Sequence, residues 1–459
     1  MLRRFRRAAG IAAALLCCAA AAPAQSLLQL YDAALAYDAA YQSARAQTRA
    51  SQAQADQARA GLLPQLALQA SAQRNFMDAQ IAGISGSINY NALNGALVGS
   101  QPLYRPANRI AWNQGREQAE LARTQLTGAE QDLIVRLSQA YFEVLAAEDA
   151  LRFVRAFKAA VAGQLEAAKR NFELGNATIT DSREAQARFD LARAQEIGAE
   201  SDLRVKQLAL DQLVGQSGSQ PCPLADPIAL PAPQPDDAQF WVDQALERHP
   251  GVRQSRMALD IARMETAKAR AGGLPTVDLQ ASVSQARYPG GNPALSMTPG
   301  AAYPYHATVT SVGVVLNWPL FAGFSIDNRV RETLALEDKA RADLDNIERT
   351  VSQSARAAFF GEQSGLAQVQ ALEAAEQSSQ TALEANQLGY KVGMRINLDV
   401  LDAQSQLYQT RRDLAKARYD ALMGLLRLKQ ASGALGRDDL LPIEALLMKQ
   451  DRYFNKDSM

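Results

Sequence analysis

The sequence predicts a mainly α-helical protein with a β contribution, built as a duplicated helix, strand, strand, helix plan. Two proline-free runs, 107–220 and 320–441, are rich in the helix formers Ala, Gln, Glu, Arg and Leu. A continuous helix over 107–174 would reach on the order of 100 Å at about 1.5 Å per residue. Between these runs lie short stretches with a period of two residues, which is typical of strands.

The duplication is clearest around two glycines. The stretch Phe-Glu-Leu-Gly-Asn-Ala-Thr-Ile-Thr-Asp at 172–181 aligns with Tyr-Lys-Val-Gly-Met-Arg-Ile-Asn-Leu-Asp at 390–399, at an offset of 218 residues. Gly175 falls on Gly393, and Asp181 falls on Asp399. In each copy we predict a helix end, a tight turn at the glycine and a new helix. Gly175 and Gly393 are therefore the predicted repeat turns.

Residues 1–24 are typical of a secretory signal peptide. Arg3, Arg4, Arg6 and Arg7 come first, an apolar run follows, and Ala-Pro-Ala at 22–24 places cleavage before Gln25. Later segments lack the 18 or so consecutive apolar residues of a transmembrane helix. Removing these four arginines from 48 basic residues leaves 44 against 48 acidic ones, so we expect no nucleic-acid partner.

Cysteine usage excludes an internal disulfide in the exported chain. Cys17 and Cys18 lie within the signal peptide, and Cys222 is the one cysteine that follows it. An alternative is a lipoprotein acylated at Cys17 or Cys18. The residues that precede these cysteines, Leu16 and Cys17, differ from the small residue that such sites usually carry.

Each half opens with a pair of helices, over 26–60 with a break near Asp38 and over 237–271 with a break at His249-Pro250-Gly251. The later helices carry coiled-coil seams and run to about Val214 and Ala431. Their apolar residues recur at three-, four- and seven-residue steps: Leu133, Leu137, Tyr141, Val144, Leu151, Val154 and Val161, and then Val400, Leu407, Leu414, Ala421 and Leu428.

The predicted strands follow Pro64 and Pro275, where apolar residues begin to alternate with small or polar ones. Return strands are expected over 92–103 and 307–320, joined in the second half by a Pro- and Gly-rich exposed loop over 288–305. Such strands fit an outer-membrane barrel, which needs at least about eight of them, so several chains would share one. The alternative is a soluble four-stranded sheet packed on helices. The signal peptide and the long helices favour the barrel.

These features divide the chain into a signal peptide (1–24), a first repeat (25–220), a Pro-rich linker (221–235), a second repeat (236–435) and a C-terminal tail (436–459). The tail is polar at its end, and we predict that it is disordered and has no assigned role.

The chain resembles the TolC family of outer-membrane efflux and type I secretion channels over nearly its whole mature length. The resemblance rests on the repeated plan, the Leu-Pro-x-Leu and Leu-Pro-x-Val strand entries, the Gln-Pro-Leu-Tyr and Trp-Pro-Leu-Phe strand exits, and the stretch 389–403. It implies a homotrimer with four strands per chain in a 12-stranded barrel, in contact with outer-membrane lipid, and a helical tunnel across the periplasm. It also implies a passive exit duct that docks to a periplasmic adaptor (membrane fusion) protein and to an inner-membrane ABC or proton-driven transporter.

The resemblance further implies a gate at the periplasmic end. Asp399 and Asp402 fall on the aspartates that line the constriction of such channels, and their spacing of three places both on one helix face. The alternative is that both are favourable acids in the first turns of a helix.

The resemblance also places Tyr390 and Arg395 as gate-latch donors toward Thr180 and Asp181. The alternative is a surface pair that contributes less than about 1 kcal/mol.

The sequence does not predict an enzyme, a cofactor or a metal site. His249 lies at a helix break and His306 near a strand start, and one mature cysteine cannot complete a usual zinc site with them. Gly-Ile-Ser-Gly-Ser at 83–87 is not a nucleophile elbow, because its second glycine comes one residue early. The competing function class is a periplasmic adaptor, for which we would expect one helical hairpin and no duplicated strand pairs.

Overall fold

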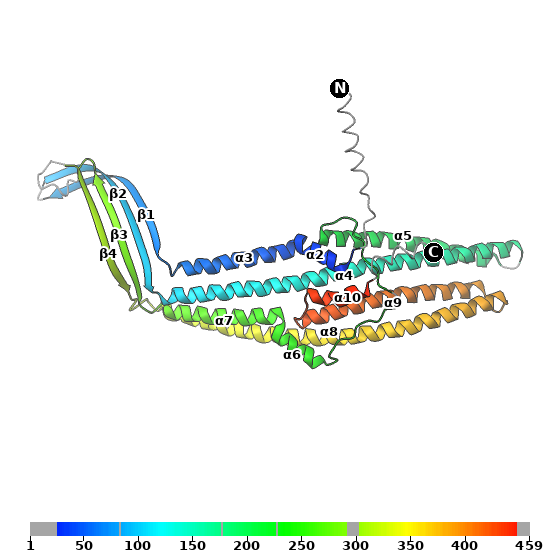
Figure 1. Ribbon diagram of the computed structural model, residues 1–459. Helices are drawn as coiled ribbons and strands as arrows, with labels where there is room; N and C mark the ends of the chain where they lie inside the picture. The colour runs from blue at the N-terminus through cyan, green and yellow to red at the C-terminus, as the bar shows by residue number, and fades with distance from the viewer. Residues whose placement is uncertain (1–24, 82–83, 176–177, 226–227, 292–302, 448–459) are drawn as a thin grey trace, which may run out of the picture. The chain divides into compact units, whose positions relative to one another are not determined.

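The computed structural model describes residues 25–81, 84–175, 178–225, 228–291 and 303–447 (Figure 1). The first copy of the plan comprises α2 (Leu27–Tyr37), α3 (Ala39–Ala60), β1 (Gln65–Ile81), β2 (Ile84–Tyr104), α4 (Pro106–Glu173) and α5 (Ile179–Val214). The second comprises α6 (Ala238–Arg248), α7 (Pro250–Ala271), β3 (Thr276–Tyr288), β4 (Tyr305–Asn317), α8 (Ser325–Lys391) and α9 (Asn397–Ala431). The predicted fold class, mainly helical with four strands in a duplicated plan, is confirmed.

Local signals in the sequence set the helix ends. α4, with 68 residues, begins at Pro106, because proline is tolerated in the first helical turn, where its missing N–H has no intrahelical partner. The predicted break near Asp38 separates α2 from α3, and the Asp38 carboxylate lies 3.0 Å from the guanidinium of Arg136 on α4. Pro250 begins α7 at the second predicted break.

The predicted seams are buried. Leu133, Leu137, Tyr141 and Val144 of α4 have no exposed surface, and all five seven-residue positions of α9 are buried. Val154 is half-buried, and Phe157 takes the buried position beside it. Coiled-coil periodicity therefore identified the packed faces of these helices correctly, with this exception.

The four strands form one antiparallel sheet in the order β1-β2-β3-β4 (Figure 1). The expected return strand over 92–103 was too short, because β2 begins at Ile84 and pairs with β1 from Ile81↔Ile84 to Gln65↔Ser100. Residues 84–91 are rich in Ser, Gly and Asn, which disfavour strands locally, and the ladder to β1 overrides that preference. Most of the predicted loop over 288–305 falls on residues 292–302, outside the described residues.

One sheet face exposes its apolar residues. In the register Leu68 lies opposite Leu97, which lies opposite Val283 on the next strand, and Leu279 lies opposite Val314. These side chains are between 36% and 79% exposed, which is costly in water. Within the described part of the chain, no helix has the length and apolar character that crossing a membrane requires.

The chain divides into two compact units. Unit 2 covers residues 47–123 and 254–345 and contains the sheet. Here Arg105, at the junction of β2 and α4, donates two hydrogen bonds to the carboxylate of Asp278 on β3, one of them 2.8 Å long. Asp278 is 6% exposed, and this charge-assisted pair holds the two copies together at the base of the sheet.

Unit 1 covers residues up to 46, 124–253 and from 346 onward, and it contains the largest apolar core. Within the predicted tail, Arg437–Asp439 form a 3-10 turn and Leu440–Leu446 form helix α10. Leu440, Ile443 and Leu447 are buried in this core. The prediction of disorder was therefore wrong for residues 436–447. Their apolar residues pack on a core that is formed by residues distant in the sequence, and the local pattern does not show that core.

Candidate functional site

The two predicted repeat turns have the same backbone geometry in unit 1. Gly175 and Gly393 both have a φ of 77°, in the left-handed region that glycine adopts without a steric penalty. The N–H of Gly175 donates to the carbonyl of Phe172 at 3.0 Å, and the N–H of Gly393 donates to that of Tyr390 at 3.1 Å. Each turn therefore ends one helix in the same way and leads to a second helix.

The second helices begin with an equivalent carboxylate. Asp181 and Thr178 form a capping box at the start of α5, in which the N–H of Thr178 donates to Asp181 Oδ2 at 3.0 Å. At the start of α9 the N–H of Ile396 donates to Asp399 Oδ2 at 3.4 Å. Asp181 and Asp399 therefore each accept a hydrogen bond from the backbone N–H of the N-cap residue of their own helix.

The two candidate gate aspartates lie one helical turn apart and have different partners. Asp399 Oδ2 lies 3.7 Å from Nη1 of Arg395, which is 59% exposed. Asp402 is 56% exposed, and its Oδ1 lies 2.7 Å from Nη2 of Arg188 on α5. Sequence reasoning missed Arg188. The available signal was its position seven residues after Asp181, on the same face of α5 two turns further along.

The predicted latch contacts are not formed within the described part of this chain. The hydroxyl of Tyr390 accepts a hydrogen bond from Nδ2 of Asn171 at 3.3 Å instead. Asp181 is already engaged in its capping box, and Arg395 lies beside Asp399. Thr180 is exposed beside Asp181. Any contact of Tyr390 or Arg395 with Thr180 and Asp181 must therefore join different chains or a different state of the turns.

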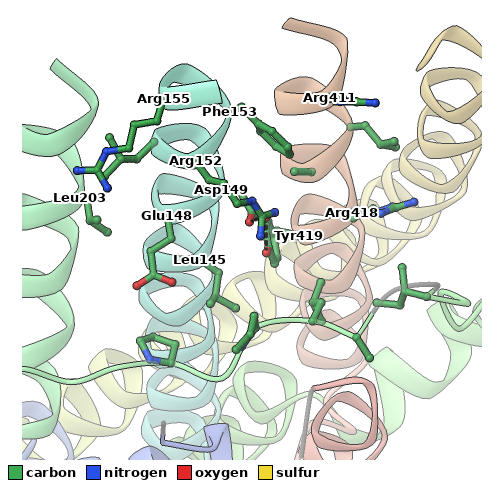
Figure 2. A pocket seen from close by; sticks show the side chains of 18 of the residues that line it. Leu145, Glu148, Asp149, Arg152, Phe153, Arg155, Leu203, Arg411, Arg418 and Tyr419 are labelled. Carbon is green, nitrogen blue, oxygen red and sulfur yellow. Dashed lines mark hydrogen bonds and ion pairs between the residues drawn. The ribbon is translucent and has the colours of Figure 1, made fainter. Parts of the chain in front are cut away.

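Unit 1 also contains a pocket of about 980 Å³ between α4, α5, the linker that follows α5, and α9 (Figure 2). On one side the hydroxyl of Tyr419 donates to Asp149 Oδ2 at 2.8 Å. Figure 2 shows the neighbouring side chain, Glu148, pointing to a different side of α4. Burial and the nearby Asp149 carboxylate raise the pKa of Glu148 to about 7. Sequence reasoning had not singled out these residues.

The two predicted histidines have no shared role. His249 ends α6 and accepts a hydrogen bond from the N–H of Gly251 at Nδ1, whereas His306 lies on β4. Burial lowers the pKa of His249. Among the described residues, no three or more His, Cys, Asp or Glu side chains lie close enough together to hold a metal ion.

Together, the duplicated helical hairpins, the exposed apolar sheet and the paired acidic turns define a channel-type membrane protein. The chain belongs to the outer membrane efflux protein family, whose model matches residues 30–216 and 241–434. The predicted resemblance and the outer-membrane location are thereby confirmed.

Relatives extend over most of the chain. It is 32% identical to outer membrane protein TolC of Vibrio cholerae serotype O1, over 92% of this chain and 94% of that protein. It is 31% identical to alkaline protease secretion protein AprF of Pseudomonas aeruginosa, over 91% of this chain and 86% of that protein. The crystal structure of outer membrane protein VceC from Vibrio cholerae superposes with a TM-score of 0.74 at 20% identity, covering 89% of this chain and 96% of that one, which shows a shared fold.

Proposed function

We propose that this chain is the passive exit duct of a tripartite efflux or type I secretion system, and that it works as a homotrimer gated at the Gly175 and Gly393 turns. Family membership and relatives named for efflux and for protease secretion support the proposal. The chain would dock to a periplasmic adaptor and an inner-membrane ABC or proton-driven transporter, and the apolar sheet face would contact lipid. The duct itself would carry out no catalysis.

One observation supports the proposed gate most strongly. Asp399 and Asp402 lie on the first turns of α9, immediately after a glycine turn that is repeated at Gly175. Three chains would bring six such carboxylates around one axis. A ring of carboxylates attracts cations and repels anions, so the constriction would be cation-selective.

The latch is proposed to form between chains. Arg395 is 59% exposed and its contact with Asp399 is long, at 3.7 Å, so its guanidinium is available to the Thr180 and Asp181 of a neighbouring chain. Two such contacts per chain, at about 0.5–1 kcal/mol each, would together shift a closed-to-open equilibrium by several kcal/mol in a trimer.

The latch variant Tyr390→Phe with Arg395→Ser is expected to raise single-channel conductance in planar bilayers at least about twofold, because the closed state loses these contacts. A matched control, Tyr408→Phe with Arg412→Ser, removes the same groups from α9 farther from the turn. Equal conductance in both double variants would contradict the latch. Folded trimers that carry no current would contradict the proposal that this chain forms an exit duct.

Arg188 supplies a separate test of the gate charge. Arg188→Ala leaves Asp402 without its 2.7 Å partner, and we expect cation-over-anion selectivity to rise roughly twofold or more. Arg183→Ala is the control, because it removes the same charge from an exposed position on α5. The reversal potential in a salt gradient measures the selectivity. The same shift for both variants would mean that Asp402 does not face the permeating ions.

A further inference from the structure

Basic residues mark one end of the apolar sheet face in unit 2. On β3, Arg287 lies four residues beyond Val283, and its Cα partner on β4 is His306. On β1, Arg74 lies six residues beyond Leu68. Side chains alternate between the two faces of a strand, so these even spacings place all three basic side chains on the same face as the apolar residues. Arg74, Arg287 and His306 are called the basic edge below.

The strands carry few charges that could neutralise the basic edge. Asp78 and Asp278 are the only acids on β1 to β4. Asp278 lies at the opposite end of the sheet and is paired with Arg105. Asp78 lies four residues beyond Arg74, which is about 13 Å along the strand. The basic edge is exposed, and neither of its arginines has an acidic partner among the described residues. Its positive charge is therefore available to an anionic ligand.

The basic edge lies one membrane thickness away from the other end of the apolar face. The ten residues from Val277 to Arg287 of β3 cover about 33 Å at roughly 3.3 Å per residue. At a strand tilt of about 40° this length spans ~25 Å, which is the height of the apolar band of outer-membrane strands. Exposed aromatic residues, which are typical of both membrane interfaces, lie at the two ends: Phe76 beside Arg74, and Trp318 just after β4.

The order of the elements assigns the basic edge to the outer leaflet. The long helices α3, α4, α7 and α8 all join the sheet at its other end, at Gln65, Tyr104, Thr276 and Asn317. In an outer-membrane protein whose helices extend into the periplasm, the strand ends without helices lie on the cell-surface side. The lipid of that leaflet is a glycolipid whose sugar headgroup carries phosphates.

The side chains of the basic edge suit a phosphorylated headgroup. A guanidinium group binds two phosphate oxygens at once through charge-assisted hydrogen bonds. Arg287 and His306 are register partners, with Cα atoms about 5 Å apart, so both can reach one phosphate. The guanidinium of Arg74 lies 5.4 Å from the ring centroid of Phe76, which keeps it at the same interface.

We propose that the basic edge binds the phosphates of the outer-leaflet glycolipid, while the acyl chains of that lipid pack on the apolar sheet face. This inference rests on the proposed function, because the sheet face must contact lipid for the site to be occupied. The bound lipid would fix the depth of the sheet in the membrane.

Binding of lipid A, the phosphorylated glucosamine lipid, to the purified full-length protein in a neutral detergent tests the proposal. We expect Arg74→Gln with Arg287→Gln to weaken binding at least about tenfold, because charge-assisted contacts to the phosphates are lost. The matched control is Arg59→Gln with Arg109→Gln, which removes two exposed arginines next to the other end of the sheet. Equal weakening in the two double variants would overturn the proposal.

Lipid A without its phosphates separates phosphate recognition from the packing of acyl chains. The wild type should bind this lipid at least about tenfold more weakly than lipid A, because the arginines then have no anion to pair with. Equal affinity for the two lipids would overturn the proposal and would mean that the arginines only extend to the headgroup level. Complete displacement of lipid A by an excess of inorganic phosphate would overturn the assignment to a lipid.

Single-channel current in planar bilayers of phosphatidylcholine, which contain no lipid A, reports on the duct separately. Current that persists in the Arg74→Gln, Arg287→Gln variant, together with loss of its lipid A binding, would support both the duct and this inference. Wild-type current without phosphate-dependent lipid binding would overturn this inference alone. Folded wild-type trimers that bind lipid A through these arginines but carry no current would contradict the duct alone.

Discussion

Gly424→Ala is expected to destabilise unit 1 by about 1–3 kcal/mol, because a methyl group at this position of α9 would have to displace the buried carboxyl group of Glu362. A Cβ atom there would lie 3.3 Å from Cδ of Glu362 on α8 and closer still to its Oε2. Glu362 is 2% exposed and fills the gap that the glycine leaves between the two helices. The midpoint of urea unfolding of the detergent-solubilised protein measures the effect.

Two further variants separate this clash from a general effect of alanine. Gly361→Ala, next to Glu362 on α8, places its Cβ in open space and is expected to stabilise the helix by about 0.5–1 kcal/mol. Glu362→Ala in the Gly424→Ala background removes the carboxyl group and should recover part of the lost stability. An unchanged midpoint in the Gly424→Ala single variant would mean that the two helices do not pack at this distance.

Glu362→Gln is expected to remove a pH-dependent loss of stability. Oε2 of Glu362 is buried without a hydrogen-bond partner among the described residues, and burial raises the pKa of this carboxyl to about 7. The unfolded chain ionises near its ordinary value of 4.5. As pH rises from about 4.5 to 7, the unfolded state therefore releases the proton first, and the wild type loses up to about 3 kcal/mol.

Thermal unfolding followed by circular dichroism between pH 4.5 and 8 checks this prediction. The wild-type midpoint should fall up to about pH 7 and then level off, whereas Glu362→Gln should show a shallower slope and a higher midpoint at pH 7. Glu148 contributes a trend of the same sign, since its pKa is also about 7, so Glu148→Gln must be measured beside it. Identical slopes for wild type and Glu362→Gln would show that Glu362 is not buried as a neutral acid.

Sequence reasoning located the elements because their signals are local. Prolines at 106 and 250 set helix starts, glycines at 175 and 393 set turns, and seven-residue periodicity identified the buried face of α9. A positive φ, which glycine adopts without a steric penalty, and the missing N–H of proline both constrain the backbone independently of tertiary contacts. The ends predicted for α5 and α9, Val214 and Ala431, agree with the structure for this reason.

Tertiary structure decided which side chains meet. Periodicity shows which face of a helix is buried, but it does not show which distant helix covers that face or in which register. Asp402 therefore contacts Arg188 of α5, and Tyr390 contacts Asn171 of α4, two partners that lie more than 200 residues away in the sequence. Glu362 of α8 and the apolar residues of α10 are likewise buried by helices that are distant in the sequence, which no local pattern shows. The sequence by itself determined the fold class, the duplication and the turns. The partners of Asp399 and Asp402 depend on the relative placement of helices far apart in the chain, which only the folded structure defines.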